Sequence, residues 1–228
     1  MTRSGRAMII TIDGPAGAGK TTVSRILADR LGYRYIDTGA LYRGVALKVS
    51  EEGIDPENDD ALEELCRSLT LAFEKDESGL RLMSGNRDIT DFIRTQEIAM
   101  LASTVSARPV VRRFLLKVQR DLADSSGVVA EGRDMGTVVF PRADAKFYLD
   151  ASTRERALRR YRETAGTHPG VTLEQIEADM IKRDHNDSTR DLAPLKPADD
   201  AVRIDSSSLS IDQVIELMLS HVNKITIR

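Results

Sequence analysis

The sequence predicts an α/β fold: a parallel five-stranded sheet with helices on both faces, plus a small antiparallel insert and a helical lid. Two observations support this prediction. Apolar, β-branched segments alternate along the chain with helical patterns, and one stretch alone has the alternating pattern of an antiparallel hairpin. At 228 residues, the chain is long enough for one sizeable core that carries a small insertion.

Short segments rich in β-branched and apolar residues are predicted as the strands. They are Met8–Ile12, Tyr33–Ile36, Gly127–Glu131, Ala145–Leu149 and Ala201–Ile204. Helical patterns lie between them, which is typical of a parallel sheet whose crossover helices cover its faces. The order of elements therefore favours a doubly wound sheet over a bundle or a sandwich.

Three helix N-termini are marked by capping boxes, in which a Ser or Thr is followed three residues later by Glu or Gln. These are Ser152-x-x-Glu155, Thr172-x-x-Gln175 and Ser210-x-x-Gln213. Asp55-Pro56 predicts a fourth helix start, with Asp55 as the N-cap and proline at the first helical position.

The predicted insert lies between Thr70 and Ile89. Alternating apolar residues there are interrupted by the turn signal Gly85-Asn86. The stretch is too short for an independent domain, so we expect a small antiparallel sheet attached to the rest of the protein.

The predicted lid runs from Tyr161 to Arg190. It contains several arginines around a loop with Gly166, Pro169 and Gly170. This pattern predicts a basic helical hairpin, which is a candidate lid over phosphate groups.

Composition excludes several classes of protein. The chain has 33 basic and 36 acidic residues, so its net charge of −3 gives no general attraction for nucleic acid. No apolar run approaches the roughly 20 residues that span a bilayer, and Met1 to Ala7 is too short for a targeting peptide. Cys66 is the only cysteine, and its helical apolar surroundings predict a buried residue. We expect a cytoplasmic monomer with no nucleic-acid or membrane partner.

The most informative motif is the glycine-rich loop Gly14-Pro-Ala-Gly-Ala-Gly-Lys20-Thr21. It matches Gly-x-x-x-x-Gly-Lys-[Ser/Thr], and it lies between a predicted strand and a predicted helix, as this phosphate-binding motif requires. Backbone amides would surround the phosphates of a nucleoside triphosphate, Lys20 would reach the β- and γ-phosphates, and the Thr21 hydroxyl would bind Mg²⁺. The motif therefore predicts a P-loop NTPase fold that binds ATP and Mg²⁺.

Three further segments carry candidate groups for a second substrate. Asp37-Thr-Gly-Ala-Leu-Tyr-Arg43 and Glu131-Gly-Arg-Asp-Met-Gly136 each follow a predicted strand, where ligands of open α/β sheets bind. Arg183, Asp187 and Arg190 are spaced so that they would share one helical face. Arginine forks suit a phosphate, and Glu131 could reach the metal through water.

These residues leave the activity open. The chain has no Asn-Lys-x-Asp segment for guanine recognition, so a GTPase is disfavoured and a small-molecule kinase is favoured. A phosphate acceptor is largely dianionic at neutral pH and needs no general base, whereas an alcohol acceptor such as shikimate would need one, for which Asp37 is placed. A different monophosphate, such as UMP, and a nucleotide-binding module without turnover remain as alternatives. The three histidines, His168, His185 and His221, are not expected to take part.

Taken together, the segments resemble the bacterial cytidylate kinase family. The resemblance rests on the glycine-rich loop, Asp37 to Arg43, Ile93-Arg-Thr-Gln-Glu, Gly132 to Pro141 and Arg190-x-x-Ala-Pro-Leu. It implies one nucleoside monophosphate kinase domain over residues 1–228, with a core at about 8–50, 110–160 and 195–228, a monophosphate-binding insert at about 55–108 and a lid at about 161–190. It also implies the reaction ATP + CMP → ADP + CDP, with dCMP as a second acceptor.

The resemblance assigns roles to residues at matching positions. It implies donor binding by Gly14, Pro15, Ala16, Gly17, Ala18, Gly19, Lys20, Thr21, Thr22 and one arginine among Arg156, Arg159 and Arg160, here assigned to Arg159. It implies that Arg43, Arg133 and Arg190 hold the CMP phosphate, that Ser103, Arg112 and Asp134 contact cytosine, and that Tyr42, Arg183 and Asp187 lie at the ribose. Thr38 stands where relatives often have serine. The implied catalytic residues are Lys20, Arg43, Arg133 and Arg190, with Thr21 on the metal.

Overall fold

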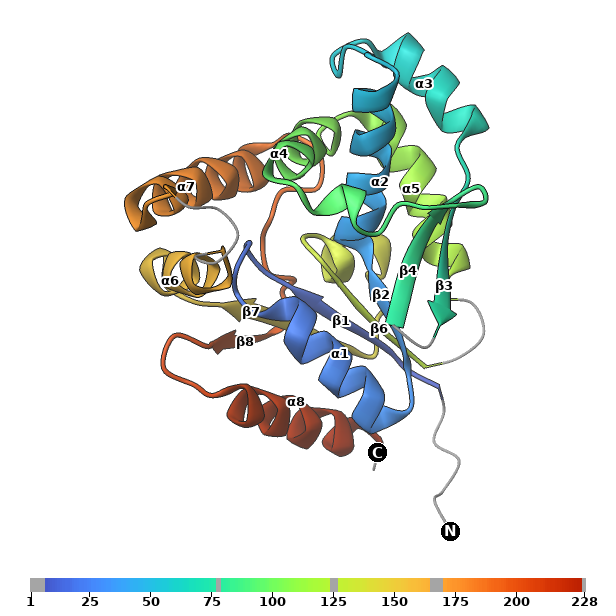
Figure 1. The fold of residues 1–228 in the computed structure, drawn as a ribbon. Helices are drawn as coiled ribbons and strands as arrows, with labels where there is room; N and C mark the ends of the chain where they lie inside the picture. The colour runs from blue at the N-terminus through green and yellow to red at the C-terminus, as the bar shows by residue number, and fades with distance from the viewer. Residues whose placement is uncertain (1–6, 77–78, 124–126, 165–169, 227–228) are drawn as a thin grey trace. The chain divides into compact units, whose positions relative to one another are not determined.

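The predicted strands form one five-stranded sheet in the computed structural model, which describes residues 7–76, 79–123, 127–164 and 170–226 (Figure 1). The sheet has the order β2-β6-β1-β7-β8, and the pairs β1–β6, β1–β7 and β7–β8 are parallel. The strands are β1 (Ile9–Asp13), β2 (Arg34–Asp37), β6 (Val128–Gly132), β7 (Ala145–Asp150) and β8 (Val202–Asp205). The predicted sheet is confirmed, and each predicted strand end lies within one residue of the observed one.

The chain is divided into two compact units. The sheet unit is Met1–Ile36 with Ala123–Arg228, and the middle unit is Asp37–Leu122. The sheet unit contains the helices α1 (Lys20–Leu31), α6 (Thr153–Thr164), α7 (Leu173–Thr189) and α8 (Ile211–Thr226), and the π-helical turn Met135–Val139. Residues 37–50 and 110–122, which the family resemblance assigns to the core, belong to the middle unit together with the predicted insert.

Strand β1 lies at the centre of the sheet unit and has two different faces. Ile10 and Ile12 are fully buried and pack in one core with residues of α1 and α8, including Leu27 and Met218. Side chains alternate along a strand, so Thr11 and Asp13 point to the opposite face. The π-helical turn lies on that face, because a Cβ added to its Gly136 would be 3.1 Å from the Thr11 hydroxyl oxygen.

The middle unit is built around helix α2 (Thr38–Glu51). The helix is buried on most of its circumference, including Leu41 and Val45, because at least five other elements pack on it. The other helices of this unit are α3 (Asp59–Ser68), α4 (Gln96–Val105) and α5 (Pro109–Asp121), with a 3-10 turn at Phe92–Arg94.

The predicted antiparallel insert is confirmed in the middle unit. Strands β3 (Leu71–Asp76), β4 (Gly79–Ser84) and β5 (Arg87–Asp88) form an antiparallel sheet in this order. Gly85, with φ of +57°, lies in the β4–β5 turn that the Gly85-Asn86 signal predicts. Gly44 of α2 lies where a Cβ would come 3.1 Å from Leu82 of this sheet, so a small residue allows the close packing.

Two of the predicted capping boxes are complete in the structure. Thr172 and Gln175 cap α7 reciprocally, and Ser210 and Gln213 do the same for α8. At Ser152, the hydroxyl accepts the Glu155 amide at 3.3 Å.

The predicted helix start at Asp55-Pro56 is wrong. Asp55 and Pro56 form a turn, in which the Asp55 carbonyl accepts the Asn58 amide at 3.0 Å. Helix α3 begins at Asp59, and the Asn58 side chain is its N-cap. Two good N-caps follow each other within one turn of chain, and the helix begins after the second.

The predicted helical hairpin is observed as α6 and α7, which pack on each other through Ala157, Ile176 and Met180. Gly166, His168 and Pro169 of its connecting loop lie outside the described residues. The expected shared helical face of Arg183, Asp187 and Arg190 is wrong in one respect. Helix α7 ends at Thr189, and Arg190 is its extended C-cap, with ψ of 141°.

Cys66 is buried in the core of the middle unit, as predicted, and burial raises the pKa of its thiol to about 11. No helix within the described ranges is long and apolar enough to cross a membrane.

The first glycine of the phosphate-loop motif lies against β7. Gly14 has φ of +149°, and a Cβ on it would be 1.9 Å from the carbonyl oxygen of Leu149. Because backbone atoms of a central strand cannot move aside, only glycine fits here.

We therefore expect Gly14→Ala to destabilise the protein much more than Gly53→Ala. Gly53 also has a positive φ, of +64°, but no atom lies within 4 Å of an added Cβ, so this control costs only about 1 to 2 kcal/mol of backbone strain. The free energies of unfolding, measured in guanidinium chloride, test this. Equal losses in the two variants would contradict the close packing of Gly14 on β7.

Candidate active site

The phosphate-binding loop connects β1 to α1. Gly17 and Gly19 have φ of +76° and +90°, which L side chains rarely adopt. Helix α1 begins at Lys20, and its N-cap, Gly19, provides no side-chain cap. The first amides of α1 are therefore left for another acceptor, and a helix N-terminus favours an anion there.

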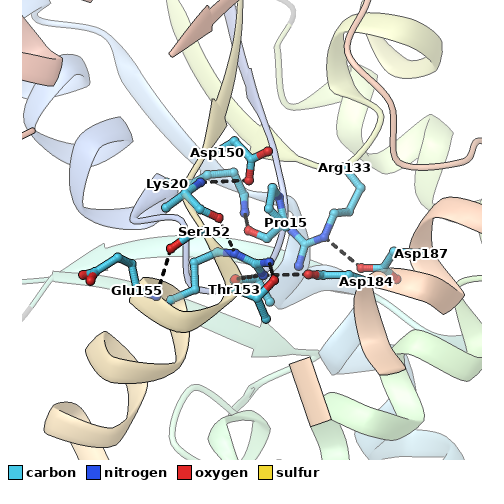
Figure 2. A network of polar contacts seen from close by, with 12 residues as sticks. Pro15, Lys20, Arg133, Asp150, Ser152, Thr153, Glu155, Asp184 and Asp187 are labelled. Carbon is cyan, nitrogen blue, oxygen red and sulfur yellow. Dashed lines mark hydrogen bonds and ion pairs between the residues drawn. The ribbon is translucent and has the colours of Figure 1, made fainter. Parts of the chain in front are cut away.

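Lys20 is almost completely buried, at 6% exposure. Its Nζ donates to the Pro15 carbonyl oxygen at 2.7 Å, within the same loop (Figure 2). Burial is the main cause that lowers its pKa to about 7, and the nearby Arg133 and Arg183 lower it further, while Glu131 and Asp13 oppose the shift. An anionic ligand would reverse this balance and favour the ammonium form.

Two arginines of α6 hold the loop from behind. Arg156 donates to the Ala16 carbonyl at 3.0 Å and pairs with Asp184 of α7 at 2.7 Å. Arg159 donates to the Ser206 carbonyl at 2.7 Å and to the Ala18 carbonyl at 3.4 Å. Figure 2 shows Asp184 in the network that also contains Lys20 and Arg133.

These contacts distinguish Arg156, Arg159 and Arg160, which the sequence offers as alternatives for one donor contact. Arg156 is buried and bound to the loop backbone, and Arg159 lies beside the loop at Gly19, 3.9 Å from an added Cβ. Arg160 is exposed and pairs with Glu163 at 3.4 Å. The predicted ATP contact, Arg159, is thus the half-buried arginine next to the loop.

A second group of charges gathers around Asp187. Arg133 Nε donates to its carboxylate at 2.9 Å (Figure 2). Burial pushes the pKa of Asp187 up, but Arg133, Arg183 and Arg190 together outweigh it and hold this pKa below its usual range. The structure therefore brings together four of the predicted residues, Arg133, Arg183, Asp187 and Arg190, within the sheet unit.

Glu131 and Thr21 are the residues that the sequence predicts for a metal ion at this loop. Glu131 is buried at the end of β6, accepts a hydrogen bond from the Tyr35 hydroxyl, and raises the pKa of Lys20 through its charge. Thr21 is exposed at the start of α1. No group of three or more His, Cys, Asp or Glu residues within the described ranges could hold a metal. One hydroxyl and one carboxylate suit Mg²⁺, which keeps several waters and binds substrate phosphates.

Asp134, another predicted residue of the sheet unit, is buried directly after Arg133. Its backbone carbonyl accepts amides of the following π-helical turn, from Val138 at 2.9 Å and Val139 at 3.2 Å. Sequence reasoning missed its neighbour Asp13, whose carboxylate binds two amides of the same turn. The signal was present: a single acidic residue at the end of an apolar strand, directly before the glycine-rich loop.

The middle unit holds the other predicted substrate residues. Thr38 is the buried first residue of α2, and Tyr42 and Arg43 follow on the same helix. The Arg112 guanidinium lies over the Tyr42 ring at 5.8 Å and donates to the Ser106 carbonyl at 3.1 Å. Ser103 of α4 accepts the Ser106 hydroxyl on its carbonyl at 2.8 Å. Tyr42 and Arg112 are thus brought together.

The low pKa of Lys20 predicts that ATP binding takes up a proton. At pH 8 only about 10% of a group with pKa near 7 is charged, whereas a bound triphosphate favours the ammonium. Calorimetry at pH 8 in buffers of different ionisation enthalpy should therefore give an uptake close to one proton. ATP affinity should fall as the pH rises above 7.

Two variants test whether Lys20 is the group that takes up this proton. Lys20→Met should abolish the uptake, and Lys224→Met, on the exposed end of α8, should leave it unchanged. Uptake that persists in Lys20→Met, or none in the unaltered protein, would contradict the assignment.

This chain is similar in sequence to known proteins over most of its length. The family model "Cytidylate kinase" matches residues 10–224. Curated proteins named cytidylate kinase are similar over most of their length: one from Citrifermentans bemidjiense is 51% identical over 95% of this chain and 93% of its own, and one from Geobacter sulfurreducens is 51% identical over 96% and 94%. "Cytidylate kinase 1" of Haemophilus influenzae is 45% identical over 95% of this chain and 94% of its own.

A solved structure shares the fold at low sequence identity. It is titled as an uncharacterized protein from Eubacterium ventriosum, is 11% identical, covers 95% of this chain and 98% of its own, and has a TM-score of 0.52. The family match spans both compact units and includes the phosphate loop and the arginines around Asp187. The chain belongs to the cytidylate kinase family.

Proposed function

We propose that this protein transfers the γ-phosphoryl group of ATP to CMP, and also to dCMP, giving ADP and CDP. One observation carries the proposal. Within the sheet unit, the buried lysine of the phosphate loop lies close enough to Arg133 and Arg183, two of the arginines around Asp187, for their charges to lower its pKa. One set of cations suits the triphosphate and the other a second phosphate. The curated relatives that are about 50% identical carry the name cytidylate kinase.

The reaction needs charge neutralisation more than proton transfer. The CMP phosphate has a second pKa near 6, so it is largely dianionic at neutral pH and attacks without a general base. The barrier lies in bringing two polyanions together in line. Lys20 and the first amides of α1 would hold the donor, and Arg43, Arg133 and Arg190 would hold the acceptor. The proposed catalytic group is therefore entirely cationic.

Mg²⁺ bound by Thr21, with Glu131 acting through water, would neutralise part of the charge on the β- and γ-phosphates. The chain's own residues do the rest. The loop amides orient the triphosphate, and Arg156 and Arg159 keep the loop in shape through its carbonyl oxygens. Arg156 and Arg159 of α6 would therefore act mainly by binding the backbone of the phosphate loop.

The resemblance to the family assigns further polar residues to the acceptor nucleotide. The Asp134 carboxylate would accept a hydrogen bond from the exocyclic amine of cytosine, and Ser103 and Arg112 would contact the cytosine ring. Tyr42, Arg183 and Asp187 would lie at the ribose, and Thr38 would provide a hydroxyl near the phosphate. Uracil presents a carbonyl where cytosine has its amine, so it would face the Asp134 carboxylate unfavourably. The cytoplasmic location and monomeric state expected from the sequence stay predictions.

ADP release with a panel of monophosphates tests the function. We expect turnover with CMP and dCMP and much less with UMP, AMP and GMP. Arg133→Met should lower kcat/KM for CMP about 100- to 1,000-fold, because a preorganised cation is lost from a buried site. Arg142→Met, which removes an exposed arginine of the same unit, is the matched control. A protein that releases ADP equally with and without every monophosphate would refute the proposal.

The alternative, an alcohol acceptor with Asp37 as the base, is not favoured by the geometry. One oxygen of Asp37 accepts the Ala40 amide at 2.9 Å as the N-cap of α2, and the other pairs with Arg43 at 3.4 Å. A carboxylate used in this way is poorly placed to remove a proton.

We accordingly expect Asp37→Asn to keep a pH profile like that of the unaltered enzyme, with kcat lowered less than about tenfold, because asparagine is an equally good N-cap. The measurement is kcat with CMP between pH 5.5 and 9. Loss of activity together with loss of a carboxylate-controlled acid limb would instead support Asp37 as a base.

A further inference from the structure

Asp13, the last residue of β1, is a buried carboxylate whose two oxygens both bind backbone amides. One oxygen accepts the Met135 amide at 2.8 Å, and the other accepts the Gly136 amide at 2.8 Å. The side chain is 3% exposed. These amides are 122 and 123 residues away in the sequence, and they directly follow Arg133 and Asp134.

The two bonds hold the segment that leaves β6. Gly132, the last residue of β6, pairs in register with Asp13, and the chain then enters the π-helical turn Met135–Val139. The residue at the N-cap position of this turn is Asp134, and its side chain makes no capping hydrogen bond. Asp13 thus caps the turn from a neighbouring strand, in place of the residue that precedes the turn.

Packing restricts the same segment. A Cβ on Gly136 would lie 3.1 Å from the Thr11 hydroxyl oxygen and 3.2 Å from Lys146 Cδ. Met135 is fully buried. The turn is therefore fixed against β1 and β7 by close contact as well as by hydrogen bonds, and the direction in which Arg133 and Asp134 leave β6 is fixed with it.

A carboxylate is a costly way to build this turn if stability were its only purpose. Burial raises the pKa of Asp13 to about 6, the nearby Asp134 raises it further, and the bonds from Gly136 and Met135 and the charge of Lys20 oppose the rise. The charged form is therefore disfavoured in the folded protein, yet it is the form that accepts both amides.

We propose that Asp13 is a positioning residue for the acceptor nucleotide: its bidentate bond to the Met135 and Gly136 amides sets the orientation of Arg133 and Asp134. This inference rests on the proposed function, in which these two residues hold the phosphate and the base of CMP. Asp13 would then influence CMP binding from the end of β1, the strand that leads directly into the phosphate loop.

The test is Asp13→Asn. Asparagine has nearly the same size but only one acceptor oxygen, so its NH₂ group meets one of the two amides donor to donor. We expect KM for CMP to rise about 10- to 100-fold, since small displacements of binding groups cost this much. The ratio of kcat/KM for CMP to that for UMP should fall, while KM for ATP changes much less than KM for CMP.

Asp144→Asn is the matched control. Asp144 also accepts a backbone amide of β1, that of Ile9 at 2.9 Å, but at the opposite end of the strand. Its variant should leave KM for CMP and the CMP preference unchanged. Equal shifts in KM for CMP and ATP in Asp13→Asn, or no shift in either, would overturn the proposal.

A second measurement separates this inference from the proposed function. Amide exchange at Met135 and Gly136, followed by NMR without any nucleotide, should speed up in Asp13→Asn and stay slow in Asp144→Asn. If the unaltered protein uses no CMP, the proposed function fails while the exchange result still tests the bonds. Unchanged exchange in Asp13→Asn overturns the role of Asp13.

Gly136→Ala gives a second route if Asp13→Asn does not fold. The added Cβ pushes the turn away from Thr11 and Asp13, so the same rise in KM for CMP, with ATP unaffected, is expected. An unchanged KM for CMP in a folded Gly136→Ala variant would also overturn the proposal.

Discussion

The site depends on holding like charges close together where little water remains. Lys20 is buried within the influence of Arg133 and Arg183, and its pKa falls to about 7. Asp187 is the anion that the arginines share, and its pKa is held low by Arg133, Arg183 and Arg190. Such an arrangement is unfavourable until an anion arrives. Nucleotide phosphates would supply the missing negative charge, so binding energy is used to relieve repulsion that the fold already contains.

Two acids, the buried Asp13 and the partly buried Asp184, organise the elements that carry these cations. Asp13 fixes the turn after Arg133, and Asp184 pairs with Arg156, which in turn holds the Ala16 carbonyl of the phosphate loop. Each acid therefore acts on backbone geometry through a small number of short contacts. These contacts explain why the sheet unit contains both a dense group of charges and a phosphate loop of defined conformation.

The fold was predictable because it follows local patterns. Alternation, glycine turns and capping boxes identified the sheet, the antiparallel insert and two helix caps. The errors arose where two local signals compete, as at Asp55 and Asn58, or where a helix ends one residue early, as at Arg190. Asp13 was missed because its partners lie 122 and 123 residues away. No local pattern reports contacts at that separation.

In the proposed reaction, one protein molecule holds both nucleotides by their phosphates at the same time. Binding of an adenosine–cytidine dinucleotide joined by five phosphates, measured by calorimetry, tests it most directly. We expect one molecule per chain, much tighter than ATP or CMP alone, and competition with both. If the dinucleotide binds no more tightly than ATP, or if CMP still binds when the dinucleotide is bound, the two nucleotides are not held together in this way.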